Sequence, residues 1–316
     1  MMTVKDFAEQ LKKEKSVALF CHVRPDGDTI GSALGIKFAL NKLGIKADVY
    51  CEEEIPEKFF YLEGAKEIRL DITERYSSYM AVDCADVTRV GKFCELFQTE
   101  KNNYNFDHHI SNNHYAKYNV IIDTSATAEN ATELVLALVG EIPEESVNAL
   151  ATGLVTDTGN FKHKNVTENT FKVASILKAN GADFNKITYY NFTKQSKNRA
   201  NLFGEVMSKI RYLLDDRLAV ITVYKSQLSR LGAKPEETEG FVDFVMGIDS
   251  VEVGVCIMEM DNGYKASFRS KEANVNEVSG KFGGGGHVLA SGCRYNGNLE
   301  EFIDKIRYYV SQQIRD

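Results

Sequence analysis

The sequence predicts an α/β protein. An N-terminal, mostly parallel sheet flanked by helices is followed by a smaller C-terminal α/β domain with a mixed sheet. In the first half of the chain, short apolar runs alternate with segments that carry apolar residues at helical spacing, which is typical of strands joined by crossover helices. In the second half, strand-like runs follow one another closely, and a glycine-rich turn precedes a terminal helix. We expect the active site in a cleft between the two domains.

The elements of the first half follow from apolar spacing and from residues that stop helices or bound strands. Ser16–His22 is a short apolar run bounded by polar residues, as expected for a buried parallel strand. The helical spacing over 29–43 ends at Gly44, which favours a helix stop. In chain order, the predicted elements are helix 3–14, strand 16–22, helix 29–43, strands 46–51 and 79–82, a segment 104–106 that leads into Asp107, and helices 129–139, 144–156 and 166–180.

The composition of the sequence changes near residue 190. Residues 191–200 are polar and basic, so we interpret them as part of a connection between domains. We therefore predict a catalytic domain over 1–190, a linker region over 191–212 and a second domain over 213–316. The second domain is expected to contain a helix after residue 200, strands at 218–223, 251–258 and 265–269, a turn at 283–286 and a helix over 299–314.

Composition limits the classes of function. The net charge of −7 and the pI of about 5.5 argue that any phosphate binding is local, through a few basic groups or metals, rather than across a whole basic face. Long duplex nucleic acid is therefore not an expected partner. The six cysteines form no C-x-x-C pair, and no apolar run approaches the length of a membrane span. These features predict a cytoplasmic protein with reduced thiols.

The first cluster of chemically active residues is His22-Val-Arg-Pro-Asp26-Gly-Asp28, between a predicted strand and a predicted helix. Active sites of open parallel sheets lie at such carboxyl ends of strands. An imidazole nitrogen with carboxylate oxygens suits a divalent metal such as manganese. The alternative is a polar turn in which an aspartate caps the helix.

Two further clusters follow later strands. Asp83-Cys-Ala-Asp86 ends one strand, where an aspartate can bind an ion or simply cap the next helix. In Asp107-His108-His109, one histidine can bind a metal while the other faces a substrate. Asp107 can orient an imidazole through its ring N–H, as carboxylates do around metal sites. A histidine pair at a helix end without a function is the competing interpretation.

Two more segments complete the candidate site. Asp157 lies among small and hydroxyl residues after an apolar helical stretch, so it can approach an ion or form an Asx cap. Far downstream, four glycines at 283–286 precede His287 and allow close approach of backbone N–H groups to an anion. Arg269, at the end of a predicted strand, can hold a phosphate in a fork. A glycine run alone would more often be a flexible loop.

Taken together, these motifs resemble the DHH phosphoesterase family, whose motifs occur in the same order, and the glycine run with His287 resembles the DHH-associated C-terminal domain. Length and domain content are most similar to those of the small oligoribonucleases that also dephosphorylate 3′-phosphoadenosine 5′-phosphate (pAp). The resemblance implies two manganese ions. One would be held by His22, Asp26 and Asp83, and the other by Asp28, Asp83, His108 and Asp157. It also implies that His109 contacts the scissile phosphate or assists proton transfer, and that the terminal phosphate or sugar of the substrate is held by Arg269, Gly285, Gly286 and His287.

The expected function is hydrolysis of short RNA to mononucleotides and of pAp to AMP. The chain has no room for the extra nucleic-acid-binding domain of RecJ-like nucleases, and it carries the glycine run that family II pyrophosphatases lack. The transmembrane and sensory segments of membrane-bound cyclic-dinucleotide phosphodiesterases are also absent from the sequence. Two alternatives stay open: a stand-alone phosphodiesterase of cyclic or linear dinucleotides, and a nucleotide-binding protein without catalysis. A homodimer is plausible for such a fold.

Overall fold

The computed structural model describes residues 2–314, which form two compact units, one running to Lys194 and the other starting at Gln195. The first unit contains a five-stranded sheet in the order β2-β1-β3-β4-β5, and every pair of neighbours is parallel. Its strands are β1 (Ser16–Phe20), β2 (Lys46–Tyr50), β3 (Ser78–Val82), β4 (Asn103–Asp107) and β5 (Tyr118–Ile121).

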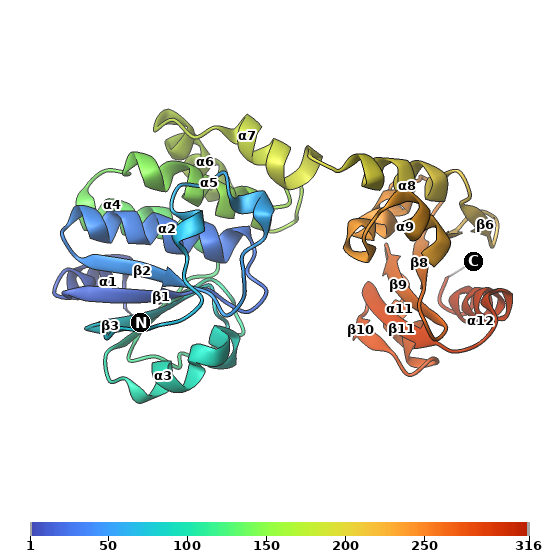
Figure 1. Cartoon of the computed structure of the whole chain (residues 1–316), viewed down its shortest axis with the longest axis horizontal. Helices are drawn as coiled ribbons and strands as arrows, with labels where there is room; N and C mark the ends of the chain where they lie inside the picture. Colours follow the sequence, from blue (N-terminus) through green and yellow to red (C-terminus); the bar gives the residue numbers. More distant parts are fainter. Residues whose placement is uncertain (1, 315–316) are drawn as a thin grey trace. The chain divides into compact units, whose positions relative to one another are not determined.

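Helices cover both faces of this sheet, because alternate strand residues point to opposite sides. Val17 and Leu19 of β1 pack in one core with the helices that lie along the upper face in Figure 1, whereas Ala18 and Phe20 pack in a second core on the side of α3. The helices of the unit are α1 (Val4–Leu11), α2 (Gly27–Lys42), α3 (Cys94–Thr99), α4 (Thr127–Val139), α5 (Glu144–Asp157), α6 (Glu168–Ala179) and α7 (Phe184–Thr188). Short 3-10 turns run over Glu57–Phe59, Ala65–Glu67 and Val87–Phe93, and a π-helical turn spans Tyr189–Thr193.

Glycines bring α2 unusually close to α5. Gly27, Gly31 and Gly35 recur every four residues, so they share one side of α2. A Cβ atom on Gly31 would lie 2.2 Å from the Ala149 carbonyl oxygen, and one on Gly35 would lie 2.6 Å from a Leu150 methyl carbon. Any larger residue would push the helices apart. This contact matters for the site, because the start of α2 and the end of α5 both carry candidate ligands.

The second unit contains a six-stranded mixed sheet in the order β10-β11-β9-β8-β7-β6, in which only β7 and β8 are parallel among the described pairs. One face packs against α11 and α12 and the other against α8 and α10, with a separate apolar core on each side. The strands are β6 (Arg211–Leu213), β7 (Leu218–Val223), β8 (Val253–Glu259), β9 (Tyr264–Ser270), β10 (Gly285–His287) and β11 (Ala290–Tyr295). The helices are α8 (Lys197–Met207), α9 (Lys225–Leu231), α10 (Phe241–Met246), α11 (Val275–Gly280) and α12 (Leu299–Ser311), and a 3-10 turn runs over Pro235–Thr238.

The α/β prediction is confirmed, with a parallel sheet in the first unit and a mixed sheet in the second. Several elements have no counterpart in the sequence prediction, among them the edge strand β5 and the hairpin of β10 and β11. Most of the polar segment 191–200 is helical in the structure: it holds the end of the π-helical turn and the start of α8. Within residues 2–314, no helix combines the length and the apolar character needed to cross a membrane.

Candidate metal centre

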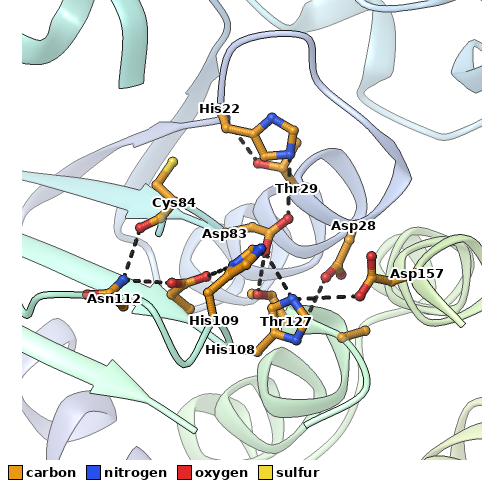
Figure 2. A network of polar contacts seen from close by, with 12 residues as sticks. His22, Asp28, Thr29, Asp83, Cys84, His108, His109, Asn112, Thr127 and Asp157 are labelled. Atoms are coloured by element: carbon orange, nitrogen blue, oxygen red, sulfur yellow. Dashed lines mark hydrogen bonds and ion pairs between the residues drawn. The ribbon is translucent and has the colours of Figure 1, made fainter. Parts of the chain in front are cut away.

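The ends of three parallel strands gather the central side chains. His22 lies just beyond β1, Asp83 follows β3, and β4 ends at Asp107, immediately before His108. Asp83 adopts a left-handed backbone conformation with φ of 61°, which turns the chain sharply at the end of the strand. Because parallel strands end at one edge of a sheet, these residues converge, as Figure 2 shows.

The start of α2 supplies two carboxylates. Asp26 caps the helix, since its side chain accepts hydrogen bonds from the backbone N–H groups of Asp28 and Thr29. Its Oδ1 atom also lies 3.4 Å from Nε2 of His22, so the side chain that caps the helix also faces a candidate ligand. In the segment 83–86, the residue that caps the following helical turn is Asp86, whose side chain accepts hydrogen bonds from the N–H and hydroxyl of Thr88. Asp83 is not the cap, and its carboxylate faces the candidate site.

The third source is the last residue of α5, Asp157. Its Oδ2 atom lies 3.6 Å from Nε2 of His108. Gly153, one turn earlier, borders Asp28 so closely that a Cβ atom there would be 2.7 Å from the Asp28 carboxylate. The close packing of α2 on α5 therefore places the carboxylates of Asp28 and Asp157 on the same side of the strand ends, as the close-up shows (Figure 2).

Two histidines are fixed with their Nε2 atoms toward the carboxylates. Nδ1 of His22 lies 2.9 Å from the carbonyl oxygen of Val23, and Nδ1 of His108 lies 2.9 Å from that of Thr124. A carbonyl oxygen can only accept, so each Nδ1 carries the proton and donates it. Each Nε2 then presents a lone pair, the arrangement found in metal-binding histidines. These Nε2 atoms lie 3.6 and 3.7 Å from the two carboxylate oxygens of Asp83, which stands between them.

His109 has a different partner. Its Nδ1 lies 2.7 Å from Oδ1 of Asp107, whose other oxygen accepts from the amide of Asn112 at 2.6 Å. This hydrogen bond raises the pKa of His109. Burial works to raise the pKa of Asp107, but the hydrogen bonds from His109 and Asn112 outweigh it and hold that pKa below its ordinary value. Asp107 is fully buried while 41% of the His109 side chain is exposed, so a buried carboxylate orients an accessible imidazole.

The remaining carboxylates repel one another. Burial, reinforced by the charges of Asp83, Asp157 and Asp26, raises the pKa of Asp28 well above its ordinary value. Burial likewise raises the pKa of Asp83, and it raises that of Asp157 to about 6. Such shifts arise where several anions share a site with little solvent. Added positive charge would therefore be bound strongly at this position.

The donor set fits divalent cations. Ligand atoms of His22, Asp26 and Asp83 all lie within 4.8 Å of one another, and so do those of Asp28, His108 and Asp157. A third group combines Asp83 with the two adjacent histidines. Nitrogen and oxygen ligands in such groups suit manganese and similar ions. The sequence-predicted ligands are thus brought together in two groups, with Asp83 in one group and within 3.7 Å of His108 in the other.

Sequence reasoning assigned no ligand at the start of α4, which nevertheless supports the site through hydrogen bonds. The backbone N–H groups of Thr127 and Ala128 donate to Asp28 at 2.6 and 2.9 Å, and the Thr127 hydroxyl donates to Asp83 at 2.8 Å. The first turn of a helix carries unsatisfied N–H groups and a partial positive charge, so it stabilises anions. Residues 125–130 include no predicted ligand, yet this turn positions two of them (Figure 2).

In the second unit, the predicted substrate-binding residues lie on neighbouring strands. Arg269 of β9 pairs with Ala290 of β11, which pairs with His287 of β10, so the arginine and the histidine lie at one level of the sheet. The guanidinium of Arg269 contacts Asp243 at 3.2 Å. Gly285 and Gly286 belong to β10, and a Cβ atom on Gly286 would lie 2.6 Å from the Ala290 carbonyl oxygen. The glycine at 286 is therefore needed for strand pairing, whether or not it also approaches an anion.

Comparison with known proteins places this geometry in a family. Residues 16–156 match the model of the DHH family N-terminal domain, and residues 215–312 match that of the DHHA1 domain. The bifunctional oligoribonuclease and PAP phosphatase NrnA of Thermus thermophilus is 29% identical over 316 residues, covering 97% of this chain and 93% of that protein. Its namesake from Bacillus subtilis is 26% identical over 292 residues, covering 88% of each chain.

A solved structure shares the fold. An exopolyphosphatase-related protein from Bacteroides fragilis superposes with a TM-score of 0.84 at 23% identity, covering 98% of this chain and 97% of that one. The two domain matches follow each other along the chain, and the parallel-sheet unit carries the clustered histidines and aspartates. The chain therefore belongs to the DHH family of phosphoesterases and carries a DHHA1 domain.

Proposed function

We propose that this protein is a manganese-dependent phosphoesterase that hydrolyses short oligoribonucleotides to mononucleotides and pAp to AMP. The observation that carries the proposal is the pair of ligand groups around Asp83, with the accessible His109 beside them. Such a site suits hydrolysis of phosphate esters, and membership of the DHH family supports it. The choice of substrates is supported by the relatives named as oligoribonucleases and PAP phosphatases at 29% and 26% identity.

The ligand assignment follows the two groups. We propose that one divalent ion would be held by His22, Asp26 and Asp83 and the other by Asp28, Asp83, His108 and Asp157, with Asp83 common to both. When bound, two such ions lower the pKa of a water molecule and neutralise charge on the phosphate oxygens. The chain contributes the fixed tautomers of its histidines and the hydrogen bonds to the Asp28 and Asp83 carboxylates, which hold the ligands in place before substrate arrives.

His109 and Asp107 act on the substrate side. The Asp107 carboxylate keeps the Nδ1 proton of His109 in a hydrogen bond, so Nε2 is the free end of the imidazole. The raised pKa of His109 increases the fraction that is protonated near neutral pH. A protonated Nε2 can donate to a phosphate oxygen or deliver a proton to the leaving oxygen as the P–O bond breaks. We therefore assign His109 as a catalytic residue and Asp107 as the group that orients it.

The DHHA1 domain is assigned a role in substrate binding. Arg269 offers a guanidinium that can exchange its Asp243 partner for a phosphate, and His287 adds a second donor at the same level of the sheet. We propose that the terminal phosphate or sugar of the substrate is held by Arg269, Gly285, Gly286 and His287.

Product analysis tests the proposal directly. Purified protein with manganese is incubated with end-labelled RNA of two to five nucleotides, with pAp, and with a linear and a cyclic dinucleotide in parallel. We expect mononucleotides from the short RNA and AMP from pAp. Cleavage of the dinucleotides alone would select the alternative of a dinucleotide phosphodiesterase. The absence of manganese-dependent cleavage of every substrate would reject the enzyme assignment and leave a nucleotide-binding protein.

Two further assignments are part of the proposal. All six cysteines are free in the structure, and all but Cys94 are buried, which suits a reducing compartment such as the cytoplasm. Homodimer formation is the expected assembly, and light scattering after size-exclusion chromatography measures it. A mass of one chain at micromolar concentration would reject the dimer without touching the catalytic assignment.

A further inference from the structure

A small cavity opens beside the metal centre, entirely within the parallel-sheet unit. It has a volume of about 210 Å³ and borders Asp26 and Asp157, one carboxylate from each ligand group. Lys58, Asn191 and Phe192 also line it. None of these three is a predicted ligand or a proposed catalytic residue. Complete ligand sites usually measure about 300–1,000 Å³, so this cavity has room for only part of a substrate.

The walls of the cavity are held in place by a network around Tyr61. Its hydroxyl accepts a hydrogen bond from the Asn191 amide at 2.9 Å and pairs with the Thr152 hydroxyl of α5 at 2.8 Å. Its ring stacks on Tyr190 at 4.7 Å between centroids. Asn191 and Phe192 lie in the π-helical turn Tyr189–Thr193, an uncommon element that often marks functional sites. The turn is thus anchored to the helix that ends at a candidate ligand.

Three groups of the cavity lack a protein partner. Among residues 2–314, the Lys58 ammonium makes no ion pair or hydrogen bond and only rests 5.1 Å from the centroid of the Phe59 ring. The Phe192 side chain is large and apolar, yet the residue is 48% exposed. The Oδ1 atom of Asn191 is the one buried side-chain oxygen in the described chain that accepts no hydrogen bond. Buried polar atoms without partners are rare, so such an atom calls for an explanation.

These features suit one nucleotide unit. A free cation next to a cluster of anions attracts a phosphate, and an exposed aromatic ring stacks on a nucleobase of any identity. We propose that the cavity with Lys58 and Phe192 is a subsite for the nucleotide adjacent to the cleaved phosphate, with the base on Phe192 and its phosphate near Lys58. The inference rests on the proposed function, because it deepens the substrate binding of the same site. It also gives the catalytic domain its own contact with the base.

The base contact is tested with Phe192→Ala against the matched control Phe171→Ala, which removes a 56% exposed phenylalanine from α6. Three dinucleotides are compared: an intact one and two that are abasic at either position. Stacking is worth about 1–3 kcal/mol per base, so we expect KM for the intact dinucleotide to rise about 5- to 150-fold in Phe192→Ala. The effect should vanish for one abasic dinucleotide and persist for the other. Phe192→Tyr should restore binding.

The phosphate contact is tested with Lys58→Gln against Lys66→Gln. The control lysine also lies over a phenylalanine ring, at 5.6 Å from the Phe60 centroid, and does not line the cavity. The slope of log(kcat/KM) against log[salt] is negative, and removal of one phosphate contact should reduce its magnitude by about one. An unchanged slope in Lys58→Gln, or equal slopes in the two variants, would overturn the assignment of Lys58.

A binding measurement separates this inference from the proposed function. A dinucleotide that carries 2-aminopurine is mixed with protein in EDTA, where turnover is blocked, and fluorescence quenching reports stacking. Quenching by the wild-type protein that is lost in Phe192→Ala and kept in Phe171→Ala supports the subsite, even if no hydrolysis of RNA or pAp is ever found. Equal quenching by both variants, or none by the wild type, overturns the subsite even if hydrolysis is normal. Melting temperatures within about 2 °C confirm that the variants fold.

Discussion

Replacement of Thr127 by valine removes a single hydrogen bond from the metal centre and leaves the shape of the side chain nearly unchanged. The hydroxyl of this residue donates to Asp83 at 2.8 Å, while its backbone N–H donates to Asp28 and is retained in the variant. The hydroxyl does not cap the helix, because Thr127 is already the first helical residue after Ala126. The change therefore isolates the support that α4 gives to Asp83.

The expected loss of manganese affinity follows from the hydrogen bond between Thr127 and Asp83. Asp83 is 3% exposed, and the imidazoles that face its Oδ1 atom lie no closer than 3.7 Å, so the hydroxyl is the only donor within hydrogen-bonding distance of that oxygen in the described chain. A hydrogen bond to a charged group contributes about 1.5–3 kcal/mol, and 1.4 kcal/mol corresponds to a tenfold change in affinity. We therefore expect Thr127→Val to weaken manganese binding by about 10- to 100-fold, the usual range for groups that orient metal ligands.

Electron paramagnetic resonance of free manganese during titration measures this affinity. Thr132→Val is the matched control, since it removes a buried threonine hydroxyl from the same helix. Among residues 2–314, that hydroxyl bonds only to the carbonyl oxygen of Ala128. Thr127→Ser should bind manganese as the wild type does. If Thr127→Val kept wild-type affinity, or if the control lost as much, the idea that the start of α4 positions the ligands would be wrong.

Three further changes probe the histidine, the charge cluster and the helix contact. Asp107→Asn should lower kcat about 100-fold and move the alkaline limb of the pH–rate profile to lower pH, because loss of the carboxylate lowers the pKa of His109; an unmoved limb would contradict this. Without metal, the raised pKa of Asp157 stabilises the fold below about pH 4, and this stability is lost as pH rises through about 6, so manganese should raise the melting temperature more at pH 7.5 than at pH 5; an equal rise at both would argue against the charge cluster. Gly31→Ala should lower the free energy of unfolding by about 1–3 kcal/mol in urea, since its Cβ would lie 2.2 Å from the Ala149 oxygen; a loss under about 0.5 kcal/mol would show that α2 can shift freely.

The convergence of two central site residues is predictable because it depends on a general property of parallel sheets. His22 and Asp83 each follow a short apolar run, and the carboxyl ends of parallel strands meet at one edge. Asp107 is harder to place, because the strand that it ends contains two asparagines. The strand order was not needed for that step. Assignment of Asp28 and Asp157 to the same centre required more, since two helices had to pack closely, and only the family resemblance suggested it.

The parts that could not be predicted depend on contacts between segments far apart in the chain. Thr127 and Asp83 are 44 residues apart, and a threonine at the start of a helix has no periodic pattern that would identify its partner. The strand β10 is three residues long and glycine-rich, so its composition favours a loop, and only pairing with β11 makes it a strand. Asn191 and Phe192 were assigned to a polar connection because the anchoring by Tyr61 comes from 130 residues away.

The arrangement of charge at this centre favours the binding of cations. Burial and mutual repulsion raise the pKa values of Asp28, Asp83 and Asp157. Partial positive charge reaches these carboxylates from the first turn of α4 and from His109. His22 and His108 each donate their Nδ1–H to a backbone carbonyl oxygen, that of Val23 or Thr124, so the neutral form of each imidazole turns the lone pair of Nε2 toward the cluster. Metal binding must therefore release protons from the carboxylates. A calorimetric titration in buffers of different ionisation enthalpy should detect that release near pH 6, and a proton count of zero there would show that the cluster is already ionised.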